Sequence, residues 1–123
     1  MRDRLGALPL FADLDEAQLE RLASATSEFE APAGQALIER GRPGSGMFVL
    51  AEGEAIVEAP EGTRTLGPGD VFGERALLGD DIERTARVRA VTDVRCLAIG
   101  RPEMERLLSD NPRLAERLTQ LSA

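Results

Sequence analysis

The sequence of 123 residues lacks histidine, lysine, tryptophan and tyrosine, and it has a single cysteine. Without histidine, the chain cannot form Ser-His-Asp or Cys-His nucleophile pairs or a histidine-based zinc site. The lone Cys96 excludes a disulfide framework, and we expect its thiol to be a small buried hydrophobe. Most simple enzyme chemistry is therefore excluded, and we expect a protein that is not an enzyme and needs neither a metal nor a cofactor.

The charge balance argues against a nucleic-acid partner. The chain has 22 acidic residues and 15 basic ones, all arginine, for a formal net charge of −7, and its only aromatic residues are 4 phenylalanines. A duplex-binding domain needs a basic face, and a single-strand binder needs aromatic stacking platforms. The apolar runs are too short to span a bilayer or to form a signal peptide. We expect a cytoplasmic single domain.

The N-terminal part reads as helical. Asp15 is a suitable N-cap with Gln18 as its capping-box partner, and Leu14 is placed to pack against Leu19. These signals predict a helix from Asp15 to about Ala25. An upstream apolar group predicts a short helix or turn on the same core: Leu5, Leu8, Leu10 and Phe11.

The middle of the chain reads as β structure. Short runs rich in apolar and β-branched residues alternate with glycines, which is typical of a sandwich or barrel. The candidate strands are Ser27–Ala31, Gln35–Glu39, Met47–Ala51, Ala55–Ala59, Thr63–Leu66, Asp70–Phe72, Arg84–Val91 and Val94–Ile99.

After Gly100 the residue pattern is again typical of helices. Pro102 suits the first turn of a helix over 101–109, and the Asn111-Pro112 step ends it. A last helix is predicted over 112–121. The chain thus divides into an N-terminal helical segment (1–26), a β body (27–99) and C-terminal helices (101–123).

The segment 72–86 contains the candidate ligand-binding residues. Gly73 permits an unusual backbone angle, and the free amides of a helical turn beginning at about Glu74 form an anion site. Arg84 opens the next strand on a face that is otherwise small and apolar, so its charge needs a partner. A phosphate on those amides suits its guanidinium, and Glu74 can accept a hydrogen bond from a sugar hydroxyl. Together these groups describe a site for a ribose phosphate.

These residues resemble the phosphate-binding cassette of cyclic-nucleotide-binding domains, the type found in catabolite activators, kinase regulatory subunits and nucleotide-gated channels. The cassette pattern is Phe72-Gly73-Glu74-x-Ala76-Leu77-Leu78 followed by Arg84-Thr85-Ala86. The resemblance covers nearly the whole chain and includes Phe11, Leu14, Gly34, Gly41, Met47 to Leu50, Gly53, Val57 and Gly67 to Asp70.

The resemblance implies an eight-stranded β-roll, jelly-roll-like, with an N-terminal helix and two C-terminal helices. Arg84 would bind the cyclic phosphate with help from the amides of residues 74–76 and the Thr85 hydroxyl. Glu74 would bind the ribose hydroxyl, assisted by the Gly73 backbone. Val57 and Leu66 would line the base and sugar, and the last helix would cap the base. The implied ligand-binding set is Phe72, Gly73, Glu74, Arg75, Ala76, Arg84, Thr85, Ala86, Val57 and Leu66.

The function implied is a sensor of a 3′,5′-cyclic nucleotide, with cAMP favoured over cGMP. It would relay binding through its C-terminal helices to an effector outside this chain, and a homodimer is one possible assembly. Two departures from the family pattern bear on affinity: Arg75 replaces an aliphatic residue, and the loop 79–83 carries three acids. Two alternatives remain, a ligand-free interaction module and an enzyme that pairs Glu74 with Asp70. For Arg84 the alternative, which the full cassette pattern makes the weaker one, is a structural ion pair with Glu74 or Asp70.

Overall fold

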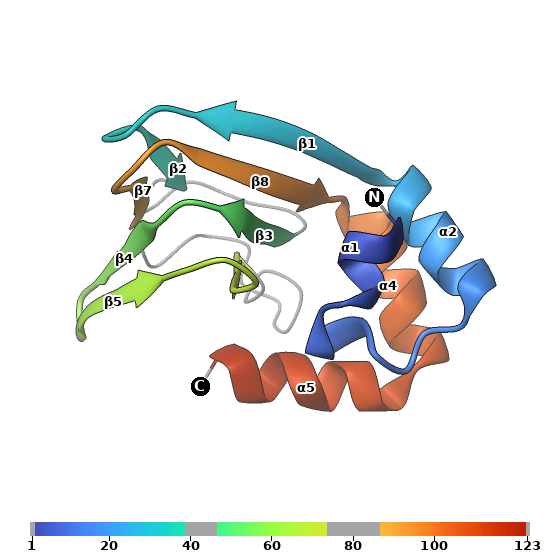
Figure 1. Ribbon diagram of the computed structural model, residues 1–123. Helices are drawn as coiled ribbons and strands as arrows, with labels where there is room; N and C mark the ends of the chain where they lie inside the picture. The colour runs from blue at the N-terminus through green and yellow to red at the C-terminus, as the bar shows by residue number, and fades with distance from the viewer. Residues whose placement is uncertain (1, 39–46, 74–86, 123) are drawn as a thin grey trace.

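The computed structural model describes residues 2–38, 47–73 and 87–122, with helices gathered at one end of two β-sheets (Figure 1). The described elements follow the order helix, β body, helix that the sequence predicts. The chain begins with α1 (Arg2–Gly6) and a 3-10 turn, η1 (Pro9–Phe11), in the region predicted as a short helix or turn. No helix of the described residues is long and apolar enough to cross a membrane.

Helix α2 (Glu16–Ser24) begins where its capping signals predict. The Asp15 Oδ1 atom accepts a hydrogen bond from the Gln18 backbone N–H at 2.8 Å, and Gln18 Oε1 accepts one from the Asp15 N–H at 3.1 Å. This reciprocal pair satisfies two of the amides that a helix leaves free at its N-terminus. The predicted capping box is therefore confirmed, and Ala25 is the C-cap.

The described β body has eight strands in two antiparallel sheets, which confirms the expected fold class. The first sheet has the order β1-β8-β3-β6 and the second β2-β7-β4-β5. The strands are β1 (Thr26–Ala31), β2 (Ala36–Ile38), β3 (Met47–Glu52), β4 (Ala55–Ala59), β5 (Gly62–Leu66), β6 (Val71–Phe72), β7 (Arg87–Ala90) and β8 (Val94–Ile99). Of the strand predicted over 84–91, residues 84–86 lie outside the described residues.

Strand β8 separates two hydrophobic cores. Side chains alternate across a strand, so Leu97 and Ile99 face the helices while Val94 and Cys96 face the space between the sheets. The core under the helices, which we call the helical cluster, includes Leu5, Leu10, Phe11, Leu14, Leu22, Met47, Val49, Leu97, Ile99, Met104, Leu107, Leu114 and Leu118. The core between the sheets, the roll cluster, includes Ala31, Leu50, Ala55, Leu66, Phe72, Val88, Ala90, Val94 and Cys96.

The C-terminal helices complete the helical cluster; in Figure 1, α4 lies beside α1 and α2, and α5 runs below them. Helix α4 (Arg101–Asp110) buries Met104 and Leu107, and α5 (Pro112–Ser122) buries Leu114 and Leu118. The helices meet at Asn111, whose backbone (φ −133°, ψ 87°) lies outside the helical region, which a residue before proline avoids. Among the described elements, α5 makes its principal contacts with α4 and η1.

We expect Gly53→Ala to destabilise the fold far more than Gly34→Ala. Both glycines have positive φ, 93° and 91°, so alanine is strained at either position. At Gly34 a Cβ would meet nothing within 4 Å, whereas at Gly53 it would collide with the Asp93 carbonyl and lie 2.9 Å from Thr92 Oγ1. Urea denaturation should give losses of about 1 kcal/mol for Gly34→Ala and about 3 kcal/mol for Gly53→Ala. Equal losses would contradict this account.

We also expect alkaline pH to weaken the fold through Cys96 alone among the side chains. Burial raises the pKa of the Cys96 thiol to about 11, so the unfolded chain releases this proton at lower pH than the folded one. The free energy of unfolding should therefore fall by about 2 kcal/mol as the pH rises from about 9 to about 11. The chain has no lysine, histidine or tyrosine to titrate there. Denaturant titrations of Cys96→Ala should lack this slope, and a slope that persists in the variant would refute the assignment.

Candidate functional site

Four apolar side chains in the interior of the roll, two from each sheet, are only partly buried. Phe29, Leu37, Phe48 and Val57 pack against the roll cluster yet keep part of their surface exposed. We call these four side chains the apolar wall, and part of their surface is accessible to solvent.

Three phenylalanine rings connect this wall to the start of the predicted cassette. The Phe29 and Phe48 rings meet edge to face at a centroid distance of 6.0 Å, and the Phe48 and Phe72 rings stack at 5.2 Å. Phe72 is 2% exposed, and the next residue, Gly73, has a φ of 80°. Phe72 thus anchors the chain in the roll, and Gly73 supplies the left-handed conformation that turns it out of β6.

Val57 and Leu66, expected to line the ligand, lie on the same face of the second sheet. In the antiparallel pair of β4 and β5, Ala55 is opposite Leu66 and Val57 is opposite Arg64. Leu66 is 1% exposed, whereas Val57 is half-buried at the accessible wall. The structure brings Val57, Leu66 and Phe72 together around the roll cluster. The other predicted site residues, Glu74, Arg75, Ala76, Arg84, Thr85 and Ala86, lie outside the described residues.

Arg64 is a candidate that the sequence reasoning missed. Because it is directly opposite Val57 and two residues from Leu66, it belongs to the interior face of the sheet. Yet Arg64 itself is exposed, which places it at the rim of the accessible wall. Counting by two back from Leu66 would have found it. Among the described residues, no carboxylate lies within ion-pair distance of its guanidinium.

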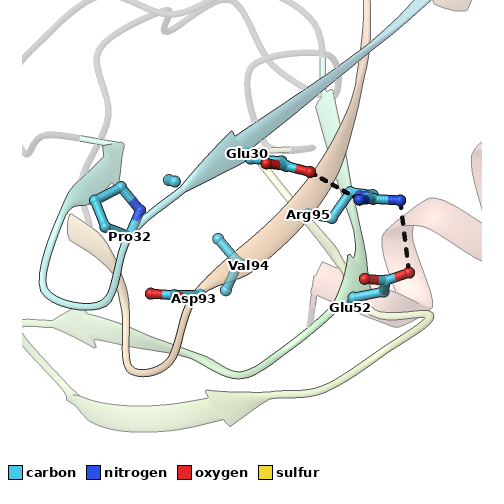
Figure 2. A pocket seen from close by; sticks show the side chains of 7 residues that line it. Glu30, Pro32, Glu52, Asp93, Val94 and Arg95 are labelled. Carbon is cyan, nitrogen blue, oxygen red and sulfur yellow. Dashed lines mark hydrogen bonds and ion pairs between the residues drawn. The ribbon is translucent and has the colours of Figure 1, made fainter.

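A hollow of about 400 Å³ lies on the outer face of the first sheet, away from the interior of the roll (Figure 2). Its only guanidinium, that of Arg95, lies 2.7 Å from Glu30 and 3.8 Å from Glu52. The hydrogen bond to Glu30, and then the negative charge of Glu52, raise the pKa of Arg95 above its ordinary value. Surrounded by carboxylates and already paired, this arginine is not available for an anionic ligand.

The Asp70 side chain forms a hydrogen bond within the turn in which it lies. Its Oδ2 atom accepts a hydrogen bond from the Gly67 backbone N–H at 2.8 Å, and the residue is exposed. The acid-base pair that the enzyme alternative requires joins Asp70 to Glu74, and Glu74 lies outside the described residues. The described residues also contain no group of three or more Asp, Glu or Cys side chains arranged to hold a metal.

A β-roll with apolar side chains partly exposed in its interior and helices at one end is an arrangement that can hold a small ligand. Residues 28–111 match the profile of the cyclic nucleotide-binding domain family. The chain therefore belongs to this family of regulatory binding domains, as its cassette pattern indicated.

Curated proteins of three kinds are similar in sequence to this chain. A cyclic nucleotide-gated potassium channel of Rhizobium etli is 36% identical over 91% of this chain and 31% of its own length. A cAMP-dependent protein kinase regulatory subunit of Aspergillus fumigatus is 39% identical over 85% of this chain and 26% of its own length. A cGMP-dependent protein kinase of Drosophila melanogaster is 37% identical over 92% and 16%. The chain spans no more than about a third of these relatives.

Solved structures agree with the fold. The regulatory domain of Toxoplasma gondii PKA with cAMP is 30% identical, with a TM-score of 0.76, over 89% of this chain and 43% of that one. The regulatory subunit of a cAMP-independent protein kinase A from Trypanosoma brucei is 27% identical, with a TM-score of 0.82, over 96% and 45%. The same fold thus occurs in a protein solved with cAMP and in one described as cAMP-independent.

Proposed function

We propose that this chain is a non-catalytic sensor module that binds a 3′,5′-cyclic nucleotide, cAMP before cGMP, in the cytoplasm. The observation that carries the proposal is the accessible apolar wall that ends at Phe72 and Gly73, where the cassette pattern begins. A purine ring needs apolar contact surface, and its phosphate needs a cation and free amides. The free, buried Cys96 suits a reducing compartment.

Each cassette residue has a proposed role. Arg84 pairs with the cyclic phosphate through its planar fork of donors, and the amides of residues 74–76 and the Thr85 hydroxyl donate to the same oxygens. Glu74 accepts a hydrogen bond from the ribose hydroxyl, with the Gly73 backbone beside it. Val57 and Leu66 contact the sugar and the base. The acids of the loop 79–83 lower the affinity to the extent that they approach the phosphate.

A change in the position of α4 and α5 transmits nucleotide binding to the effector. Nucleotide binding stabilises an arrangement in which these helices close over the base, and the population of that arrangement rises with ligand. An almost complete switch requires about 5 kcal/mol of preference for the closed arrangement. The effector that responds is a protein or domain outside the 123 residues. A ligand-free interaction module is the alternative, and the cAMP-independent kinase subunit is its precedent in this fold.

Arg64 favours cGMP as a second candidate ligand. A guanidinium only donates hydrogen bonds. Guanine presents two acceptors, N7 and O6, on the edge where adenine presents one acceptor and one donor. A base resting on Val57 would lie beside the exposed guanidinium of Arg64, which therefore prefers guanine.

Arg84→Leu should abolish nucleotide binding with little loss of stability. Removing the guanidinium leaves the phosphate charge without its partner, so calorimetric titration with cAMP and cGMP should show a loss of about 100-fold or more. Glu74→Ala removes one hydroxyl contact and should cost about tenfold. Arg87→Leu, at an exposed position of β7, is the matched control and should bind normally. Undiminished affinity in Arg84→Leu would refute the assignment.

Arg64→Ala should weaken cGMP binding by about three- to tenfold and leave cAMP binding nearly unchanged, because only guanine offers two acceptors to it. Thr65→Ala serves as the control, since Thr65 is on the opposite face of the same strand. Parallel titrations of both nucleotides measure the ratio of affinities. An equal effect on the two nucleotides would show that Arg64 does not read the base.

A further inference from the structure

Helices α2 and α4 lie side by side, because both adjoin the first sheet at the same place. Thr26, the first residue of β1, is paired with Ile99, the last residue of β8. Helix α2 ends just before this pair, and α4 begins just after it. Between the two helices lies a groove of about 830 Å³, which follows α2 from its N-cap Asp15 to its C-cap Ala25. At the rise of an α-helix this is a length of about 15 Å.

Helix α4 contributes Glu103 and Arg106 to this groove, which we call the α2–α4 groove. The Glu103 side chain is only 11% exposed, and its Oε2 atom lies 3.3 Å from Arg106 Nη1. The other oxygen, Oε1, is buried and has no hydrogen-bond partner among the described residues. Leaving a buried carboxylate oxygen without a donor is costly, and such groups are rare in folded proteins. Glu103 is therefore an underpaired negative charge in the lining of the groove.

The other described cation of the groove does not supply the missing donor. This cation is Arg21 of α2, whose Nη2 atom lies 4.0 Å from Asp110 Oδ2. The C-terminal end of α2 also lines the groove, and the last carbonyl groups of a helix carry partial negative charge. The underpaired carboxylate and this helix end both attract a positively charged group.

A guanidinium is the cation that suits Glu103 best. A carboxylate can accept two parallel hydrogen bonds from the planar guanidinium fork, which an ammonium group cannot provide. The terminal torsion of a glutamate side chain rotates easily, so both oxygens can turn toward an incoming guanidinium in place of the single contact with Arg106. The groove is open and elongated, whereas small-molecule sites enclose most of their ligand, so its shape fits a protein segment.

We propose that the α2–α4 groove docks a protein segment through an arginine side chain that pairs with Glu103. The inference goes beyond the proposed function, because it requires no nucleotide and applies equally to a ligand-free interaction module. In Figure 1, α2 lies at the opposite end of the molecule from β4 and β5, which carry Val57 and Leu66. The docking surface is therefore separate from the proposed nucleotide site.

The probe is an acetylated and amidated pentapeptide with one arginine among alanines, titrated into the isotope-labelled full chain and followed by NMR. At low salt, where exposed charges are least screened, the amide signals of residues 15–25 and 101–106 should shift in a saturable way. A single paired charge supports a dissociation constant on the order of 10 mM. The same peptide with lysine should bind about threefold more weakly, because an ammonium lacks the fork, and a glutamine peptide should cause no saturable shift.

Three variants locate the contact. Glu103→Gln keeps the shape of the side chain and removes its charge, so it should weaken binding of the arginine peptide by about tenfold. Arg106→Gln removes the competing contact and should strengthen binding by about two- to threefold. Arg113→Gln removes the same charge from an exposed position of α5 outside the groove, and it should bind as the wild type does.

The exposed position of Arg106 keeps the test decisive even if Glu103→Gln does not fold, because Arg106 is 59% exposed. Equal affinity of Arg106→Gln and Arg113→Gln would overturn the proposal. So would an undiminished response of a folded Glu103→Gln, or the absence of saturable shifts in the wild type. The titrations contain no nucleotide, so these outcomes leave the proposed function untouched. Conversely, a wild type that binds neither cAMP nor cGMP would refute the proposed function and leave the docking groove in place.

Discussion

The alternation of side chains along β8 is the constraint on which the rest of the structure depends. Leu97 and Ile99 support the helices, and Val94 and Cys96 support the roll, so a single strand forms the wall between two cores. A shift of one residue in its pairing with β1 and β3 would exchange the two sets. Because both cores share this strand, the helices that pack on it and the apolar side chains of the roll are held in a fixed relation.

Arginine supplies every side-chain cation in this protein, and the structure uses it in different settings. Arg95 is enclosed by carboxylates on the outer face of the first sheet, and Arg117 bridges a carboxylate and a carbonyl. Arg64 stands at the rim of the roll with no described carboxylate in reach. A guanidinium stays charged at any pH that leaves the protein folded. Geometry and pairing, and not titration, therefore distinguish the structural arginines from those proposed to bind ligand.

Sequence patterns over a few residues predicted the features that depend on neighbouring residues, such as helix caps. The capping box of Asp15 and Gln18 was predictable because each side chain bonds a backbone amide only three residues away. Arg64 was not found because β5 is exposed at every position but Leu66, so its strand shows no apolar alternation. The Arg117 contact joins residues 108 positions apart and leaves no trace in either local sequence. Glu74 and Arg84 were assigned from the cassette pattern, and their roles stay predictions.

The phenylalanine ladder makes the protein convenient to observe. Three of the four aromatic side chains in the chain are Phe29, Phe48 and Phe72, and their rings touch in series between β1 and Gly73. The aromatic region of a proton NMR spectrum would therefore be nearly empty apart from this group, and ring currents would spread its resonances. A purine bound against the wall would displace those signals directly, without any label. Since tryptophan and tyrosine are absent, ultraviolet absorbance near 260 nm would report almost only nucleotide, and after free nucleotide is removed it would measure the bound amount.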